Sequence, residues 1–184
     1  MPARGPRPRP DALHVDLAVD TTEEPPAGLS RWLRPKIAAA ARHLGHAGGH
    51  LSVAVVDDAQ MALLHHHHLG DPTTTDVLTF DLRDAAAEGG DAGPLDGELV
   101  LCFDEAGRRA AELGHDVKRE LLLYAVHGLL HLTGHDDITP DAAAAMHEAE
   151  DACLAALGVG PVYRPSQNAK TPRGPRRTPR KAKK

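Results

Sequence analysis

Hydrophobic and polar residues alternate along the chain with two different periods, which predict where strands and helices lie. Leu13, Val15, Leu17 and Val19 are separated by single residues that are polar or small, a pattern typical of a half-buried strand. Comparable runs predict further strands over residues 51–56, about 77–82 and 97–103. We therefore expect four strands, all within about the first hundred residues and separated by helical or loop segments.

Apolar residues at helical spacing predict five helices. Ser30, Asp104 and Asp116 are the expected N-caps of three of them, and the last helix turns Met146 and Cys153 toward the core. The predicted helices cover residues 30–44, 58–64, 104–113, 117 onward and 142–157. The resulting order, β-α-β-α-β-β-α-α-α, predicts an α+β domain in which a small mixed β-sheet packs against helices.

The fourth of these helices carries two histidines within a run that is apolar nearly all round. His127 and His131 are four residues apart, so on a helix they lie on one face, one turn from each other. Gly134 then favours a helix end and a reversal that brings His135, Asp136 and Asp137 back toward them. Burying an imidazole within an apolar helix costs free energy unless the ring nitrogens bind a metal or form hydrogen bonds. Two imidazoles and a carboxylate match an open zinc site with three protein ligands and a water.

Two other interpretations of this helix are weaker. Histidines in a helix are often ordinary core or surface residues, but the apolar surroundings, the glycine and the acidic turn together favour a metal site. A zinc peptidase would carry a glutamate directly after the first histidine, as its general base. Gly128 occupies that position, so a peptidase is disfavoured.

The stretch from His127 to Asp137 resembles the signature of a known family. It reads His-Gly-Leu-Leu-His-Leu-Thr-Gly-His-Asp-Asp and is similar to the His-Gly-x-Leu-His-Leu-x-Gly-Tyr-Asp-His pattern of the YbeY family of bacterial metal-dependent endoribonucleases. The resemblance implies one Zn²⁺ ion, with His127 and His131 as the first two ligands. The family's third ligand position falls on Asp137, an oxygen donor that zinc accepts, and its Tyr position falls on His135. Asp137 is the predicted third ligand and His135 the alternative.

The resemblance extends from about Leu13 to Leu157 and carries a functional expectation. Residues 75–80 and 96–102 resemble two further family segments. The family implies a zinc-dependent, single-strand-specific endoribonuclease in ribosomal RNA processing and ribosome quality control, with ribosomal RNA or the small ribosomal subunit as partner. It also implies a metal at one end of a cleft beside the sheet.

One departure from the family pattern motivates other functions. An arginine that the family uses in RNA cleavage falls on Leu69, and the nearest cation candidates are Arg83 and the histidines at 65–68. A ribosome-associated RNA-binding factor with a structural metal and little cleavage is the alternative function. A hydrolase of another phosphoester or of an amide is a weaker third hypothesis.

Two further features near the site have more than one interpretation. Asp136 is the predicted catalytic residue, either as a hydrogen-bonding partner of a ligating imidazole or as a base, and the alternative is that it only caps the turn. For the histidines at 65–68, a solvated helix end is favoured over contact with substrate or metal.

Charge divides the chain into three parts, although the net charge is only −5. Residues 1–11 form a predicted disordered basic arm, 12–165 the metal-dependent hydrolase domain, and 166–184 a disordered basic tail. Without the eleven cations of these two ends, the chain would carry a net charge of −16. Lys181, Lys183 and Lys184 in the tail are therefore the predicted RNA contacts.

The chain lacks an apolar run of membrane-spanning length and a recognisable signal peptide, so a cytoplasmic protein with reduced Cys102 and Cys153 is expected.

Overall fold

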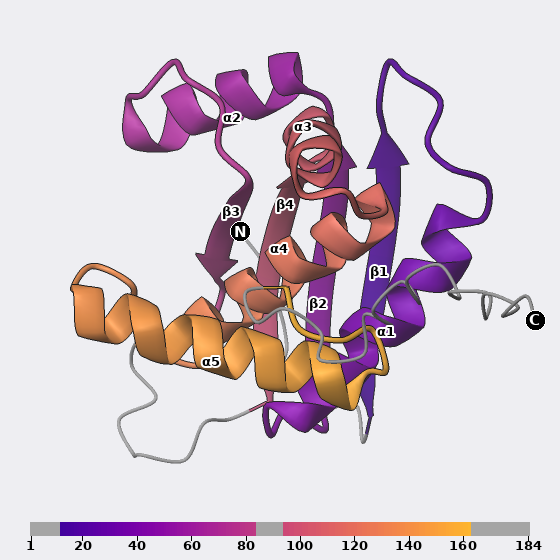
Figure 1. The fold of residues 1–184 in the computed structure, drawn as a ribbon. Helices are drawn as coiled ribbons and strands as arrows, with labels where there is room; N and C mark the ends of the chain where they lie inside the picture. The colour runs from indigo at the N-terminus through magenta and orange to yellow at the C-terminus, as the bar shows by residue number, and fades with distance from the viewer. Residues whose placement is uncertain (1–11, 84–93, 163–184) are drawn as a thin grey trace, which may run out of the picture.

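The fold is described from a computed structural model, which defines residues 12–83 and 94–162 (Figure 1). The predicted N-terminal arm, the basic tail with Lys181, Lys183 and Lys184, and most of the loop before residue 94 lie outside the described residues. None of the helices within the described ranges is long and apolar enough to cross a membrane.

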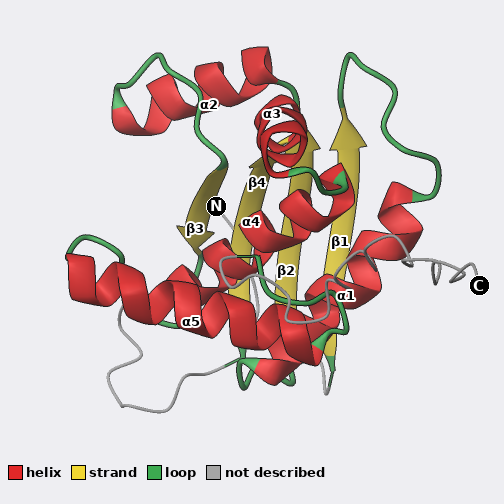
Figure 2. Cartoon of the chain, in the orientation of Figure 1, coloured by secondary structure: helices red, strands yellow, loops and turns green. Residues whose placement is uncertain are grey.

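A four-stranded mixed sheet forms the centre of the molecule (Figures 1 and 2). The strands are ordered β1-β2-β4-β3. β1 (Leu13–Asp20), β2 (Gly49–Val56) and β4 (Leu95–Cys102) run parallel, and β3 (Val77–Asp81) pairs antiparallel with β4. This confirms the predicted α+β class with a small mixed sheet, and it leaves β3 at an edge.

Five helices surround this sheet in the described ranges, in the predicted order. They are α1 (Leu29–His43), α2 (Asp58–Leu69), α3 (Phe103–Leu113), α4 (Val117–Leu132) and α5 (Pro140–Ala156). α1 and α4 pack against one face of the sheet, and α5 lies over α4 on the outside (Figure 2). α2 packs through Met61 on the opposite face, where a second and smaller apolar cluster forms. The histidines at 65–68 belong to the last turns of α2, as the favoured interpretation of a helix end requires.

α4 is a buried helix, as predicted, and a glycine lets it approach the sheet closely. Leu121, Leu122, Leu129 and Leu130 are fully buried in the main core. A Cβ atom added at Gly128 would lie 2.6 Å from Cδ2 of Leu99 and 2.9 Å from Oγ1 of Thr79. The position after His127 therefore has no room for the glutamate of a zinc peptidase.

Replacing Gly128 by Ala should destabilise the protein, because the new methyl group would enter occupied space between α4 and strands β3 and β4. We expect the free energy of unfolding to fall by about 1–3 kcal/mol, as for other overpacked cores. Thermal or urea unfolding measures this. Gly107 in α3 is the matched control, because a Cβ there meets nothing within 4 Å. Gly107→Ala should raise the stability by up to about 1 kcal/mol; equal effects of the two changes would contradict the packing argument.

The predicted N-cap of α4 is confirmed. The Asp116 carboxylate accepts a hydrogen bond of 2.8 Å from the backbone N–H of Lys118. α2 and α5 are capped in the same way, by Asp57 and Thr139. These caps hold the N-terminal ends of three helices by contacts that lie within a few residues in sequence.

Two other predicted N-caps are wrong, because core residues extend the helices beyond them. α1 begins at Leu29 and not after Ser30, and α3 begins at Phe103 and not after Asp104. Leu29 and Phe103 are both buried, so packing makes each helix begin before the polar residue that was expected to cap it. The Asp104 carboxylate instead accepts a hydrogen bond from the backbone N–H of Asp58 at the start of α2, 2.8 Å away.

Candidate metal centre

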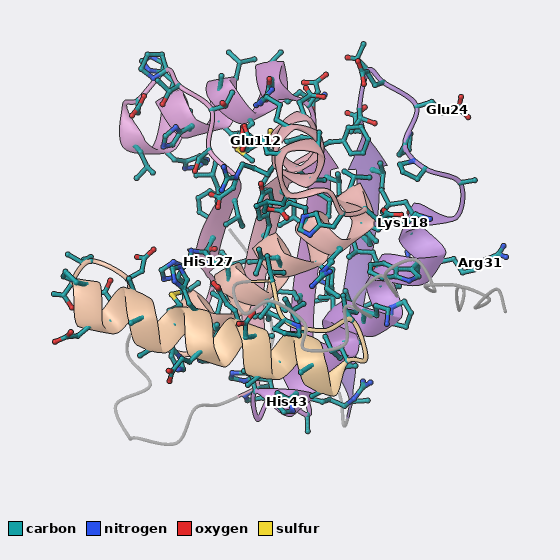
Figure 3. The ribbon with its side chains drawn as sticks, viewed as in Figure 1. Glu24, Arg31, His43, Glu112, Lys118 and His127 are labelled. Carbon is teal, nitrogen blue, oxygen red and sulfur yellow. The ribbon has the colours of Figure 1, made fainter. Side chains whose placement is uncertain are left out.

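Two imidazoles meet at the C-terminal end of α4. The rings of His127 and His131 lie nearly perpendicular, with 4.6 Å between their centroids. Their Nε2 atoms are 3.0 Å apart. The spacing of four residues thus places both histidines on one face of the helix, and both Nε2 atoms point at the same small volume. Figure 3 shows His127 on α4, between the ribbons of α5 and β3.

The chain reverses just after α4 and carries a carboxylate back to these rings. Gly134 adopts a φ of 88°, which favours glycine, and the backbone N–H of His135 closes the reversal on the carbonyl of Leu130 at 3.0 Å. Asp137 follows, with Oδ2 3.8 Å from Nε2 of His127. His127, His131 and Asp137 each offer one metal-binding atom, and these three atoms lie within 4.8 Å of one another. In the part of the chain that the structure describes, no other group of three such side chains lies close enough to hold a metal ion.

The hydrogen bonds of the two Nδ1 atoms determine whether each Nε2 atom carries a proton or a free lone pair. Nδ1 of His127 lies 2.6 Å from Oε1 of Glu150, and Nδ1 of His131 lies 3.1 Å from the backbone carbonyl oxygen of His135. Since both partners are acceptors, each Nδ1 carries the proton in the neutral ring and each Nε2 carries a lone pair.

Two facing lone pairs at 3.0 Å repel unless a proton or a metal ion lies between them, so the geometry of this contact tests whether a metal fits. A tetrahedral zinc ion with Zn–N bonds of about 2.0–2.1 Å would separate two ligand nitrogens by about 3.3 Å. The observed separation is close to that value, and Asp137 adds the oxygen donor. The three residues therefore fit a metal of this kind and leave one position open.

The surroundings of His127 also favour positive charge. Burial alone would lower the pKa of this imidazole. The hydrogen bond and the charge of Glu150, together with the charges of Asp76 and Asp137, outweigh burial and hold the pKa above its ordinary value. Carboxylates that stabilise a proton on the ring in this way would stabilise a metal cation at the same place.

The structure separates the two candidates for the third ligand. Nδ1 of His135 lies 2.9 Å from the hydroxyl of Thr133, and this side chain is not part of the cluster. Asp137, in contrast, approaches His127 directly. Asp136 accepts a hydrogen bond of 3.0 Å from the backbone N–H of Ile138, and its side chain is exposed. The turn-capping contact expected as the alternative for Asp136 is therefore present.

Glu150 is a site residue that the sequence pattern did not single out. It lies on the inner face of α5, between Met146 and Cys153, and it is fully buried. Its Oε2 atom has no hydrogen-bond partner. A carboxylate in the middle of an apolar helix face was the available signal, because such a group is rarely buried without a function or a partner.

A groove leads from the metal centre along the edge of the sheet. It encloses about 560 Å³ and runs from His127, His131 and Asp137 past β3 to His68 and Leu69 at the end of α2. β3 pairs with β4 on one side only, through residues of even number: the carbonyl of Asp76 accepts from Cys102, and the N–H of Leu82 donates to Asp96. The backbone groups of the odd-numbered residues of β3 therefore point to the free edge.

Arg83, the candidate replacement for the missing family arginine, is used elsewhere. Its Nη2 atom donates to the carbonyl of Leu132 at 2.6 Å, and its Nε atom donates to Asp81 at 2.8 Å. The guanidinium thus caps the C-terminal end of α4 and braces the metal-binding turn. Leu69 itself lies in the groove and is 68% exposed.

Comparisons with known proteins match the chain to one family. The family model described as endoribonuclease YbeY matches residues 18–158. Proteins named endoribonuclease YbeY from Laribacter hongkongensis and Geobacillus kaustophilus are 35% and 32% identical to the chain. The alignments cover 86% and 80% of this chain and 92% and 97% of the relatives. The solution structure of TM1509 from Thermotoga maritima shares the fold, with a TM-score of 0.51 and 20% identity over 84% of this chain and 99% of that one. Because the family match runs from β1 to the end of α5 and includes every residue of the cluster, the chain belongs to the YbeY endoribonuclease family.

Proposed function

We propose that this protein is a zinc-dependent endoribonuclease that cuts single-stranded RNA, and that it acts in the cytoplasm on ribosomal RNA in small-subunit maturation and ribosome quality control. The relatives that cover most of the chain are named endoribonucleases. The observation that carries the proposal is the position of the His127, His131 and Asp137 cluster at the end of an open groove along β3. A groove beside a free strand edge can receive an extended chain.

The residues of the site have separate roles in this proposal. His127 and His131 would hold zinc through Nε2 and Asp137 through its carboxylate, while Glu150 and the carbonyl of His135 keep the two rings in the correct tautomer. Zinc in such a site polarises a phosphoryl oxygen and makes a bound water more acidic. Asp136 does not contact a ring nitrogen, so the role proposed for its exposed carboxylate is proton transfer at the mouth of the site.

Cleavage of a labelled single-stranded RNA under single-turnover conditions tests the proposed function. We expect zinc-loaded protein to cut the single strand at least about tenfold faster than the same sequence in a duplex, because pairing buries the groups that the groove must contact. A strand with one deoxynucleotide at the cut position then separates two routes. Continued cutting would indicate attack by water, and loss of cutting would indicate attack by the RNA 2′-hydroxyl. Equal cutting of duplex and single strand would contradict the proposed specificity.

One observation favours the alternative, an RNA-binding factor with a structural metal and little cleavage. Leu69 occupies the position of the family arginine, and within the described residues no lysine or arginine lines the groove. Phosphate binding would then depend on the basic tail, including Lys181, Lys183 and Lys184. This alternative predicts binding to small ribosomal subunits that is lost when residues 166–184 are removed, without measurable cutting. Robust cleavage by the metal-loaded protein excludes it.

Glu150 should set the metal affinity through His127. Glu150→Gln keeps the size of the side chain but removes the charge that orients and polarises the imidazole. We expect zinc affinity to fall about 10- to 100-fold, as measured by competition with a chromophoric chelator. Asp141→Asn in the exposed first turn of α5 is the matched control and should leave the affinity unchanged. Unaltered zinc affinity in Glu150→Gln would show that the contact is only structural.

A further inference from the structure

A second cavity adjoins the metal centre on the side of α3 and α5. It encloses about 280 Å³ and is lined by residues of α3, α4 and α5 and by the segment before β3. This cavity and the groove along β3 share Thr75, Asp76 and His127 in their walls. A chain that occupies the groove and meets the metal ligands can therefore place a neighbouring group in the second cavity.

Two buried polar atoms in the wall of this cavity have no hydrogen-bond partner. They are Oε2 of Glu150 and the hydroxyl oxygen of Tyr124. Glu150 is fully buried, and Tyr124 as a residue is 4% exposed. Buried polar groups are nearly always hydrogen bonded, because an unsatisfied group loses its hydration without compensation. The carboxylate oxygen accepts hydrogen bonds only, so a ligand that satisfies it must supply an N–H or O–H donor.

Charge decides which part of an RNA chain can enter. Asp76, Glu105 and Glu120 also line the cavity, and their negative charge disfavours a phosphate. Burial, reinforced by these three carboxylates, raises the pKa of Tyr124 above its ordinary value, so the hydroxyl keeps its proton and can donate. The cavity therefore favours an uncharged group that carries several N–H donors.

The cavity also contains a hydrogen-bond donor, the guanidinium of Arg109, for acceptor atoms of a ligand. Arg109 lines the wall, and its guanidinium pairs with Glu112 at 2.7 Å on the exposed side of α3, where Figure 3 labels Glu112. Both side chains of this pair are about half exposed or more, and exposed pairs of this kind contribute little stability. Arg109 can therefore turn to a ligand at small cost. A mixed set of donors and acceptors fits a nucleobase better than a bare metal cation, which needs acceptors alone.

We propose that this cavity is a subsite for a guanine base of the RNA, next to the nucleotide whose phosphate meets the metal centre. Guanine alone among the four bases presents adjacent N–H donors, at N1 and N2, so it can supply one donor to Oε2 of Glu150 and a second to another carboxylate of the cavity wall, such as that of Glu105. Its O6 and N7 atoms are the usual acceptors for an arginine side chain. Leu123 and the ring of Tyr124 supply apolar surface for the base. The subsite rests on the proposed RNA substrate and adds a sequence preference to it.

Binding of mononucleotides to the zinc-loaded full chain tests the subsite without any cleavage. NMR titrations would compare guanosine, inosine and adenosine 5′-monophosphates, which carry the same phosphate. We expect the guanosine nucleotide to bind about tenfold more tightly than the inosine nucleotide, which lacks the N2 amino group. Tyr124→Phe and Glu105→Gln should each lower guanosine monophosphate affinity severalfold to about tenfold, with thermal unfolding as the check that both variants fold.

Glu112→Gln is the matched control, because Glu112 pairs with Arg109 without lining the cavity, and it should keep or increase the preference for guanosine monophosphate. Equal affinity for the three nucleotides in the wild type, or affinity unaltered in both folded variants, would overturn the subsite. Displacement of guanosine monophosphate by magnesium alone would also overturn it, in favour of a cation site. A protein that selects guanosine monophosphate but cuts no RNA would contradict the proposed function and leave the subsite standing.

Discussion

A His131→Ala protein should fold normally and lose both its bound zinc and its RNA cleavage. His131 lies near the end of α4, where alanine is a good helix former, so the change removes a ligand without disturbing the helix. Its Nε2 atom faces that of His127 at 3.0 Å, and the turn holds its other nitrogen in place. With one of three protein ligands gone, zinc should bind more than about 100-fold more weakly, since even a residue that only supports a ligand contributes 10- to 100-fold.

Cleavage should fall further than metal affinity in this variant. A metal contributes several kcal/mol of transition-state stabilisation, and each 1.36 kcal/mol corresponds to a factor of ten in rate. We therefore expect a loss of about 1000-fold or more in the single-turnover rate. His43→Ala is the matched control, because His43 is exposed on α1 and Figure 3 shows it far from His127. A His131→Ala protein that keeps a full equivalent of zinc would refute the ligand set.

Asp137→Ala should empty the metal site, and His135→Ala should leave it filled. Asp137 is the carboxylate that the turn brings to His127, whereas the ring of His135 lies against the hydroxyl of Thr133. Loss of the third ligand would leave two imidazoles, too few for a stable zinc site with an open position. Metal analysis of the purified proteins measures the outcome, with a loss comparable to that in His131→Ala expected for Asp137→Ala alone.

A third variant separates metal binding from chemistry at the same turn. Asp136→Asn should keep its zinc, because Asp136 contacts the backbone of Ile138 and no ring nitrogen, and it should lose cleavage if its carboxylate transfers a proton. Wild-type cleavage in this variant would reduce Asp136 to a turn cap. If instead His135→Ala emptied the site and Asp137→Ala did not, the ligand would be the histidine and the observed turn would have to rearrange on metal binding.

Local sequence signals predict much of the fold and the three residues of the candidate metal cluster. The interval between His127 and His131 equals one helical turn, and Gly134 marks the reversal, so a short stretch of chain holds all three proposed ligands. The order of strands and helices likewise follows from alternation and helical spacing. Contacts within a few residues depend little on the rest of the molecule, which is why such patterns are informative.

The remaining features depend on packing between segments that are distant in sequence. Glu150 reaches His127 across 23 residues, and only the packing of α5 against α4 brings the two together. The N-caps expected at Ser30 and Asp104 were wrong because burial of Leu29 and Phe103 decides where those helices begin. No local pattern contains these tertiary contacts, so neither could be read from one sequence.

Titration of zinc into metal-stripped protein, with single-turnover cleavage of a single-stranded RNA measured at each step, tests the central claim most directly. If His127, His131 and Asp137 hold one ion that is required for cleavage, the rate should rise in proportion to added zinc and level off at about one equivalent. Cleavage at the full rate before any metal is added, or no cleavage with the site filled, would contradict the account.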